Sequence, residues 1–125
     1  MELIISNTGE KAIYEQIYDS VREQILSGKI QPDEPLPSIR TLAKDLRISV
    51  ITTKRAYDEL ERDGFIAAVP SKGCFARRQD KAIVREQYLR DIEECLEKAF
   101  DLARAGDIGN DKMDALYSMI KEGGI

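Results

Sequence analysis

The sequence predicts a mainly α-helical fold with one small β-hairpin, and three observations lead to this prediction. Apolar residues recur every three or four positions through most of the 125-residue chain, which is the period of an amphipathic helix. Between residues 65 and 76 that period is lost, and two short apolar runs flank a Pro-Ser-Lys-Gly sequence typical of a turn. Serines that can cap helices and glycines that can end them stand at the borders of the periodic segments.

The first helix is expected to begin at Ile13 and to end before Gly28, after a short extended start at residues 3–5. Isoleucine or valine recurs every fourth residue from Ile13 to Ile25, so one face of this helix is apolar. Gly28 is suited to the left-handed conformation that commonly follows a helix. The segment after it favours a stiff extended connection because of three prolines: Pro32, Pro35 and Pro37.

Two short helices separated by a tight turn are predicted next. Ser38 can cap a helix over residues 39–46, and Ser49 can cap a second one that runs to about residue 63. In each case the serine hydroxyl would accept a hydrogen bond from a backbone N–H that has no partner inside the helix. This arrangement is a helix-turn-helix pattern.

A hairpin follows at once. Gly64 ends the second short helix, and strands are expected at residues 65–69 and 74–76, joined by a turn at residues 70–73. A helix-turn-helix followed directly by a β-hairpin describes a winged helix. We therefore predict a winged helix-turn-helix domain over residues 1–78.

The remaining residues, 79–125, are predicted to form a two-helix dimerisation region. The first of its helices carries an apolar seam at intervals of three and four: Leu89, Ile92, Leu96, Ala99 and Ala103. A seam of about two heptads is too short to fold alone and needs a partner surface, for which a second copy of the chain is the expected source. Gly106 and Gly109 interrupt the pattern, and a last short amphipathic helix follows with Met113, Leu116, Tyr117 and Ile120.

The residue content excludes several kinds of catalytic site. The chain has no histidine, which rules out a Ser-His-Asp triad, a His-paired cysteine nucleophile and a His-ligated zinc ion. It also lacks a glycine-rich phosphate loop, and no metal or other cofactor is expected. We therefore predict that the protein is not an enzyme.

The cysteine content and the apolar runs indicate a cytoplasmic protein. Cys74 and Cys95 lie far apart in the sequence, so we expect no disulfide framework and a small packing role for each. No apolar run approaches the roughly 20 residues that a bilayer span needs, so no membrane is expected as a partner. The first five residues lack the features of a signal peptide.

Charge is divided unevenly along the chain. The net charge is −4 overall, but residues 38–78 carry nine basic and five acidic side chains, a local balance of +4. Residues 79–125 carry seven basic and eleven acidic side chains, a balance of −4. A basic middle and an acidic end are compatible with DNA binding by the helix-turn-helix, because the local field matters more there than the total charge.

The helix that begins at Ser49 is the main candidate for DNA contact. One of its faces suits a core and carries Thr53, Ala56, Tyr57 and Leu60. The opposite face suits a DNA groove and carries Ile51, Lys54, Arg55 and Asp58. A recognition helix presents its N-terminal residues to base edges in the major groove, and its first backbone N–H groups favour phosphate.

The predicted DNA contacts extend from this helix to its neighbours. Arg40 is expected to contact a phosphate or a guanine, or alternatively to form a surface ion pair with an acid such as Asp45. Val50 and Ile51 fit thymine methyl groups, although the same apolar pair also fits a protein partner. The full set is Ser38, Arg40, Lys44, Ser49, Val50, Ile51, Thr52, Lys54, Arg55, Lys72 and Gly73.

These motifs resemble the GntR family of bacterial transcription regulators, and within it the short YtrA-like subfamily. The matching stretches, which span roughly residues 3–76, are Ile13–Ile17, Gly28–Pro32, Leu36–Ala43, Thr52, Ala56–Ile66 and Gly73–Phe75. The resemblance implies DNA contacts from Arg40, from the helix that begins at Ser49 and from the wing around Lys72. It also implies two C-terminal helices that dimerise in place of a large effector-binding domain.

The chain departs from the family pattern at three positions. Such sequences usually have proline where Ala12 stands, and glycine where Asp33 and Ser71 stand. Replacing glycine by Ser71 is expected to make the wing tip less flexible, so the contact of the wing with the minor groove is the least secure of the set.

Together these features predict a homodimeric repressor that binds double-stranded DNA at an inverted-repeat operator. Two-fold symmetry of the protein would place the half-sites about one helical turn, or a multiple of it, apart. Two other functions stay open. The winged helix could be a protein-interaction adaptor, or a small-molecule effector could bind between the C-terminal helices, near Tyr88, Met113 and Tyr117.

Overall fold

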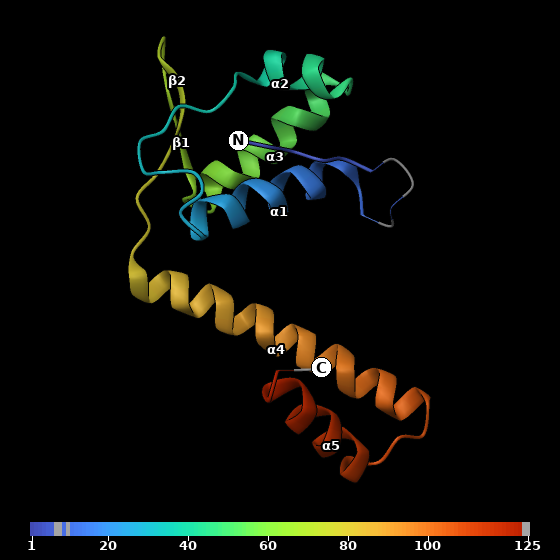
Figure 1. Ribbon diagram of the computed structural model, residues 1–125. Coiled ribbons are helices and arrows are strands. Elements are labelled where there is room, and N and C mark those ends of the chain that lie inside the picture. The colour runs from blue at the N-terminus through green and yellow to red at the C-terminus, as the bar shows by residue number, and fades with distance from the viewer. Residues whose placement is uncertain (7–8, 10, 124–125) are drawn as a thin grey trace. The chain divides into compact units, whose positions relative to one another are not determined.

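The computed structural model describes residues 1–6, 9 and 11–123, and within these the chain forms five helices and one antiparallel pair of strands (Figure 1). The elements in order are α1 (Ile13–Leu26), α2 (Ile39–Leu46), α3 (Val50–Arg62), β1 (Ile66–Val69), β2 (Gly73–Ala76), α4 (Lys81–Ala105) and α5 (Asn110–Lys121). The chain divides into two compact units, Met1–Asp80 and Lys81–Ile125. The predicted mainly helical fold with a β-hairpin is confirmed.

The core of the first unit lies between α1 and α3. Ile17 and Val21 of α1 and Leu60 of α3 are fully buried, and Phe65 and Ile66 close the core at the beginning of the hairpin. The four-residue period of α1 therefore forms one apolar face, and that face packs against the inner side of α3. Burial of this side determines which side chains of α3 face outward.

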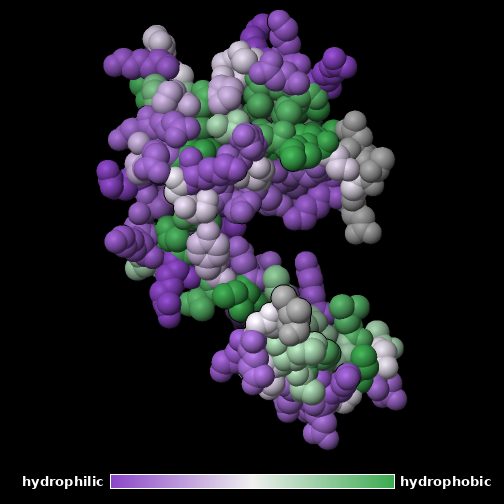
Figure 2. Space-filling model, viewed as in Figure 1, coloured by the Kyte–Doolittle hydropathy of each residue, from purple (hydrophilic) through white to green (hydrophobic). Residues whose placement is uncertain are grey.

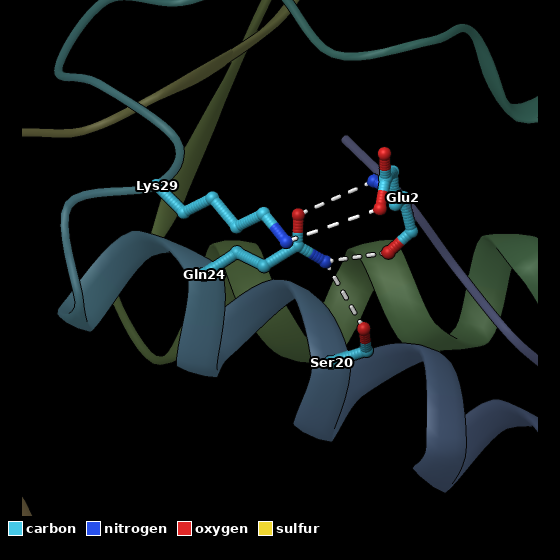
Figure 3. A network of polar contacts seen from close by, with 4 residues as sticks. All are labelled: Glu2, Ser20, Gln24 and Lys29. Carbon is cyan, nitrogen blue, oxygen red and sulfur yellow. Dashed lines mark hydrogen bonds and ion pairs between the residues drawn. The ribbon is translucent and has the colours of Figure 1, made fainter.

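A buried glutamine attaches the N-terminal segment to α1 (Figure 3). The side chain of Gln24 accepts a hydrogen bond from the backbone N–H of Glu2 at 3.3 Å and donates one to the backbone carbonyl of Glu2 at 2.8 Å. It also donates to the hydroxyl of Ser20 at 3.1 Å, and the ammonium of Lys29 lies 3.9 Å from the carboxylate of Glu2. These bonds satisfy the buried amide and allow Leu3 to pack against the core.

The two helices of the helix-turn-helix begin with the same capping arrangement. The hydroxyl of Ser38 accepts from the backbone N–H of Thr41 at 3.1 Å, and that of Ser49 accepts from the backbone N–H of Thr52 at 3.0 Å. Both predicted N-caps are confirmed. The turn between the helices is tight because Arg47 adopts the left-handed conformation, with φ 57° and ψ 47°.

The hairpin is one residue tighter than the sequence predicts. Gly73 pairs with Val69 and so belongs to β2, where the prediction placed it in the turn. The backbone N–H of Lys72 donates to the carbonyl of Val69 at 3.0 Å, which closes a turn whose third residue, Ser71, has φ 67°. A positive φ at this position of a turn favours glycine, so the serine is strained there.

The segment that leads into α2 pairs with the outer side of β2. The backbone N–H of Leu36 donates to the carbonyl of Cys74 at 2.9 Å, and Pro35 forms a bridge with Phe75. Asp33, at the bend before this segment, has φ 66°. Both positions at which the family resemblance implies glycine therefore have the left-handed backbone that glycine favours.

The second unit leaves most of its apolar side chains in solvent. Leu96, in the middle of the seam on α4, is 51% exposed, and Tyr117 and Ile120 on α5 are more exposed still. Figure 2 shows apolar side chains, coloured green, on the surface of this unit. The two helices together do not cover the seam.

None of the helices that the structure describes has the length and apolar content of a membrane span.

Candidate nucleic-acid interface

Helix α3 has a buried face and an exposed face, as its sequence predicts. Thr53, Tyr57 and Leu60 are buried in the first unit, and the hydroxyl of Thr53 donates to the carbonyl of Ser49 at 3.1 Å. On the opposite side Ile51 is 81% exposed. An apolar side chain that is exposed so fully is costly to hydrate and is available to a partner surface.

The capping serines use their hydroxyls within the helix-turn-helix. Besides accepting from a backbone N–H, Ser49 donates to the hydroxyl of Thr52 at 2.7 Å, and Ser38 donates to the hydroxyl of Thr41 at 2.8 Å. These bonds fix the first turn of α2 and of α3. Ser38, Ser49 and Thr52 were all predicted as DNA contacts, and the contacts that the structure gives their hydroxyls are those of helix caps.

Lys54 extends from the second turn of α3, and its side chain is 61% exposed. Its ammonium lies 2.7 Å from the carboxylate of Asp58, one turn further along the same helix. An exposed pair of this kind contributes about 0.3–0.5 kcal/mol, so a phosphate can replace the carboxylate at small cost. Two of the three donors of the ammonium remain available.

Arg55 is held by a residue from a different helix. Its guanidinium carbon lies 3.7 Å from the centroid of the Tyr14 ring, and its Nη2 donates to the hydroxyl of Tyr14 at 3.0 Å. Its Nε is 3.8 Å from the carboxylate of Glu59. This contact could not be predicted from the sequence, because no local signal joins residues 41 positions apart.

The other predicted basic contacts are exposed on α2 and on the hairpin. Arg40 lies in the first turn of α2, Lys44 lies one turn later, and Lys72 lies at the tip of the hairpin. Within the part of the chain that the structure describes, none of the three has a carboxylate within ion-pair distance. The ion pair between Arg40 and Asp45 that the sequence allowed is therefore absent.

These elements gather at one side of the first unit. In Figure 1 the tip of the hairpin, helix α2 and the beginning of α3 all lie at the top of that unit. A shallow groove along the exposed face of α3 is lined by Ile51, Lys54, Arg55, Asp58, Glu59 and Arg62. Three cations and two carboxylates thus share the groove, with Ile51 as its apolar member.

The two cysteines differ in their surroundings. Cys74 is partly buried beside the core, and burial raises the pKa of its thiol, with smaller contributions from Glu61 and Asp58. Its predicted packing role is confirmed. Cys95 is exposed on α4, so the same prediction fails for it within this chain. Among the described residues, no group of His, Cys, Asp and Glu side chains is arranged to hold a metal ion.

Comparison with known proteins decides the family. A family model described as "Bacterial regulatory proteins, gntR family" matches residues 13–76, the segment from α1 through β2. The chain belongs to this family. Over 110 residues it is 32% identical to the HTH-type transcriptional repressor YtrA of Bacillus subtilis. The aligned region covers 88% of this chain and 82% of YtrA.

Solved structures of GntR regulators have the same fold. A GntR family transcriptional regulator from Listeria monocytogenes superposes with a TM-score of 0.71 at 27% identity, covering 87% of this chain and 95% of the other. AraR(DBD) in complex with operator ORX1 superposes with a TM-score of 0.52 at 25% identity, covering 61% of this chain and 98% of the other. This GntR-family protein is a transcription regulator with a DNA-binding domain, and not an enzyme.

Proposed function

We propose that this GntR-family regulator is a cytoplasmic repressor that binds an inverted-repeat operator as a homodimer. The observation that carries the proposal is the exposed face of α3, where Ile51, Lys54 and Arg55 line one groove and are each more than half exposed. Names of relatives add support, since YtrA, which matches most of the chain, is a transcriptional repressor.

In this proposal α3 enters the major groove. Val50 and Ile51 contact base edges and thymine methyl groups, while Lys54 and Arg55 contact phosphates. Base contacts determine sequence preference, whereas phosphate contacts determine affinity and its dependence on salt. Changing Ile51 is therefore expected to alter the preferred bases, and an equal loss of affinity for every sequence would contradict that role.

The residues around α3 then set the position of the protein on the duplex. Arg40 and Lys44 contact the backbone on one side of the groove, and Lys72 and Gly73 of the wing contact the backbone or minor groove on the other. Ser38, Ser49 and Thr52 stand at the first turns of α2 and α3, where free backbone N–H groups favour a phosphate. Residues 1–78 form the DNA-binding domain in this scheme.

Residues 79–125 supply the contact between the two copies. The seam on α4 leaves Leu89, Ile92 and Leu96 about half exposed, and covering them would remove a large apolar area from water. A C2 pairing of two seams would make the assembly symmetric, which predicts an inverted repeat. The surplus of acidic residues in this region keeps it away from the phosphates.

Selection of bound sequences from a random pool of duplexes, using the full chain, tests the whole proposal. Enrichment of an inverted repeat with half-sites about one helical turn apart, or a multiple of it, supports it. Enrichment of a single asymmetric site would contradict the dimer. Binding of no sequence above the level of mixed DNA would contradict operator recognition and favour the adaptor function, for which the exposure of Val50 and Ile51 is the supporting observation.

The same purified protein distinguishes a regulator that senses a small molecule. If an effector binds between the C-terminal helices, near Tyr88, Met113 and Tyr117, the melting temperature rises with that compound through mass action. A panel of metabolites that leaves the melting temperature unchanged would favour a repressor without such an effector site.

A further inference from the structure

The contact between Tyr14 and Arg55 joins α1 to the exposed face of α3. The guanidinium stacks on the ring, with 3.7 Å between its central carbon and the ring centroid, and the tyrosine hydroxyl accepts a hydrogen bond from Nη2 at 3.0 Å. A planar guanidinium on an aromatic face gains from both the ring quadrupole and dispersion. Two interactions of different kinds thus fix the same group.

The side chain of Tyr14 is held in place by the core of the first unit. Its ring is partly buried and packs against the core cluster of the first unit, so its position depends on the fold and not on Arg55. Arg55 is the mobile partner, since its side chain is 59% exposed and carries several rotatable bonds. The stack therefore removes conformational freedom from Arg55 before any ligand arrives.

The fixed guanidinium still has donors to offer. Of its five N–H groups one is used by the tyrosine hydroxyl, and Nε is 3.8 Å from the carboxylate of Glu59, which is longer than a hydrogen bond. The tyrosine hydroxyl keeps its own proton as a further donor after accepting from Arg55. Arginine and tyrosine together present several donors at the edge of the α3 groove, a set that suits a phosphate oxygen.

We propose that Tyr14 is a positioning residue for DNA binding, which holds the guanidinium of Arg55 in the orientation that contacts one backbone phosphate. The inference rests on the proposed function. A side chain ordered in advance loses less entropy on binding, so the gain appears as affinity. This role of Tyr14 also makes the beginning of α1 part of the surface that contacts DNA, in addition to the helix-turn-helix and the wing.

A double-mutant cycle in DNA binding tests this role. The probe is the duplex that the wild-type full chain enriches most from a random pool, and the proteins are wild type, Tyr14→Leu, Arg55→Ala and the double variant. We expect Tyr14→Leu to weaken binding about fivefold when Arg55 is present, from the loss of a stack worth about 1 kcal/mol, and to have little effect beside Arg55→Ala. Tyr14→Phe, which keeps the ring and loses the hydroxyl, should fall between wild type and Tyr14→Leu.

Two further measurements separate positioning from a merely structural role. Arg55→Ala should lower the slope of log affinity against log salt by about one phosphate, and Tyr14→Leu should lower it by less, since the charge remains. Tyr18→Phe is the matched control, because Tyr18 lies one turn along α1 and its hydroxyl donates to Asp63 at 2.6 Å, away from Arg55. It should leave DNA affinity unchanged at a temperature where every variant is folded by circular dichroism.

An equal loss from Tyr14→Leu in both backgrounds would overturn the positioning role while leaving operator binding intact. Failure of the wild-type chain to enrich any duplex would instead overturn the proposed function itself, and this inference with it. An undiminished affinity of Tyr14→Leu for the enriched duplex would also overturn the inference.

Discussion

Replacing Tyr57 by phenylalanine removes one hydroxyl from the centre of the helix-turn-helix. Tyr57 is 2% exposed, and its hydroxyl donates to the carbonyl of Pro37 at 2.7 Å. This bond ties α3 to the residue immediately before the cap of α2, so it fixes the two helices relative to each other. Phenylalanine keeps the ring and its packing, so the expected loss of stability is that of the hydrogen bond alone, about 1–2 kcal/mol at neutral pH.

The same hydroxyl makes stability depend on alkaline pH. Burial, with a smaller contribution from Cys74, raises the pKa of Tyr57 above its ordinary value of about 10. Below pH 10 the group is protonated in the folded and the unfolded chain, and its contribution is fully present. Above pH 10 the unfolded chain releases the proton while the folded chain keeps it, so stability falls by up to about 1.4 kcal/mol per pH unit.

Tyr57→Phe lacks this titration, and the two proteins should therefore converge in stability as the pH rises above about 10. Urea denaturation followed by circular dichroism, at intervals from pH 7 to pH 11, measures both effects. Ionisations that both proteins share cancel in the difference. Tyr88→Phe is the matched control, since Tyr88 is exposed on α4. A constant difference between wild type and Tyr57→Phe across the pH range would refute the reasoning, as would equal stability at pH 7.

Three other changes test the interface and the fold. Arg40→Ala should weaken binding to all duplexes alike and reduce the salt slope by about one, and an unchanged slope would reject Arg40 as a phosphate contact. Leu96→Glu should shift the protein to monomer in sedimentation equilibrium, because it places a charge in the seam, and a dimer that survives this change would contradict the seam. Ile83→Glu is the control, since Ile83 is exposed and lies on the opposite side of α4 in a helical projection, and it should leave the dimer intact. Ser71→Gly should stabilise the hairpin by up to about 1 kcal/mol by relieving its positive φ of 67°, seen as a higher melting temperature, whereas a lower one would count against strain there.

The ends of the helices could be predicted because their signals are local. Ser38 and Ser49 cap α2 and α3 through bonds that span three residues, and Gly64, with φ 85°, ends α3 at the position expected. The face of α3 that turns outward could also be predicted, since Thr53 and Leu60 lie on one side of a helical projection and Ile51 lies on the other.

Contacts between distant segments could not be predicted in this way. The stack of Arg55 on Tyr14 depends on how α1 packs against α3, and periodicity reports that Tyr14 faces the core without saying which residue lies at the edge of that contact. The pairing of Pro35 with Phe75 likewise joins two segments that carry no shared pattern. Cys95 was also expected to be packed, and it is exposed on α4.

The bridge between the residues before α2 and strand β2 has a mechanical consequence. Leu36 is hydrogen-bonded to Cys74, and Ser38 caps α2 two residues later, so short contacts join the hairpin to the helix-turn-helix. A displacement of the hairpin therefore also displaces the beginning of α2, because the connecting segment is hydrogen-bonded to β2. In the proposed complex with an inverted repeat, such a joined domain would tolerate little variation within a half-site, and a change in the separation of the half-sites would have to be accommodated outside residues 1–80.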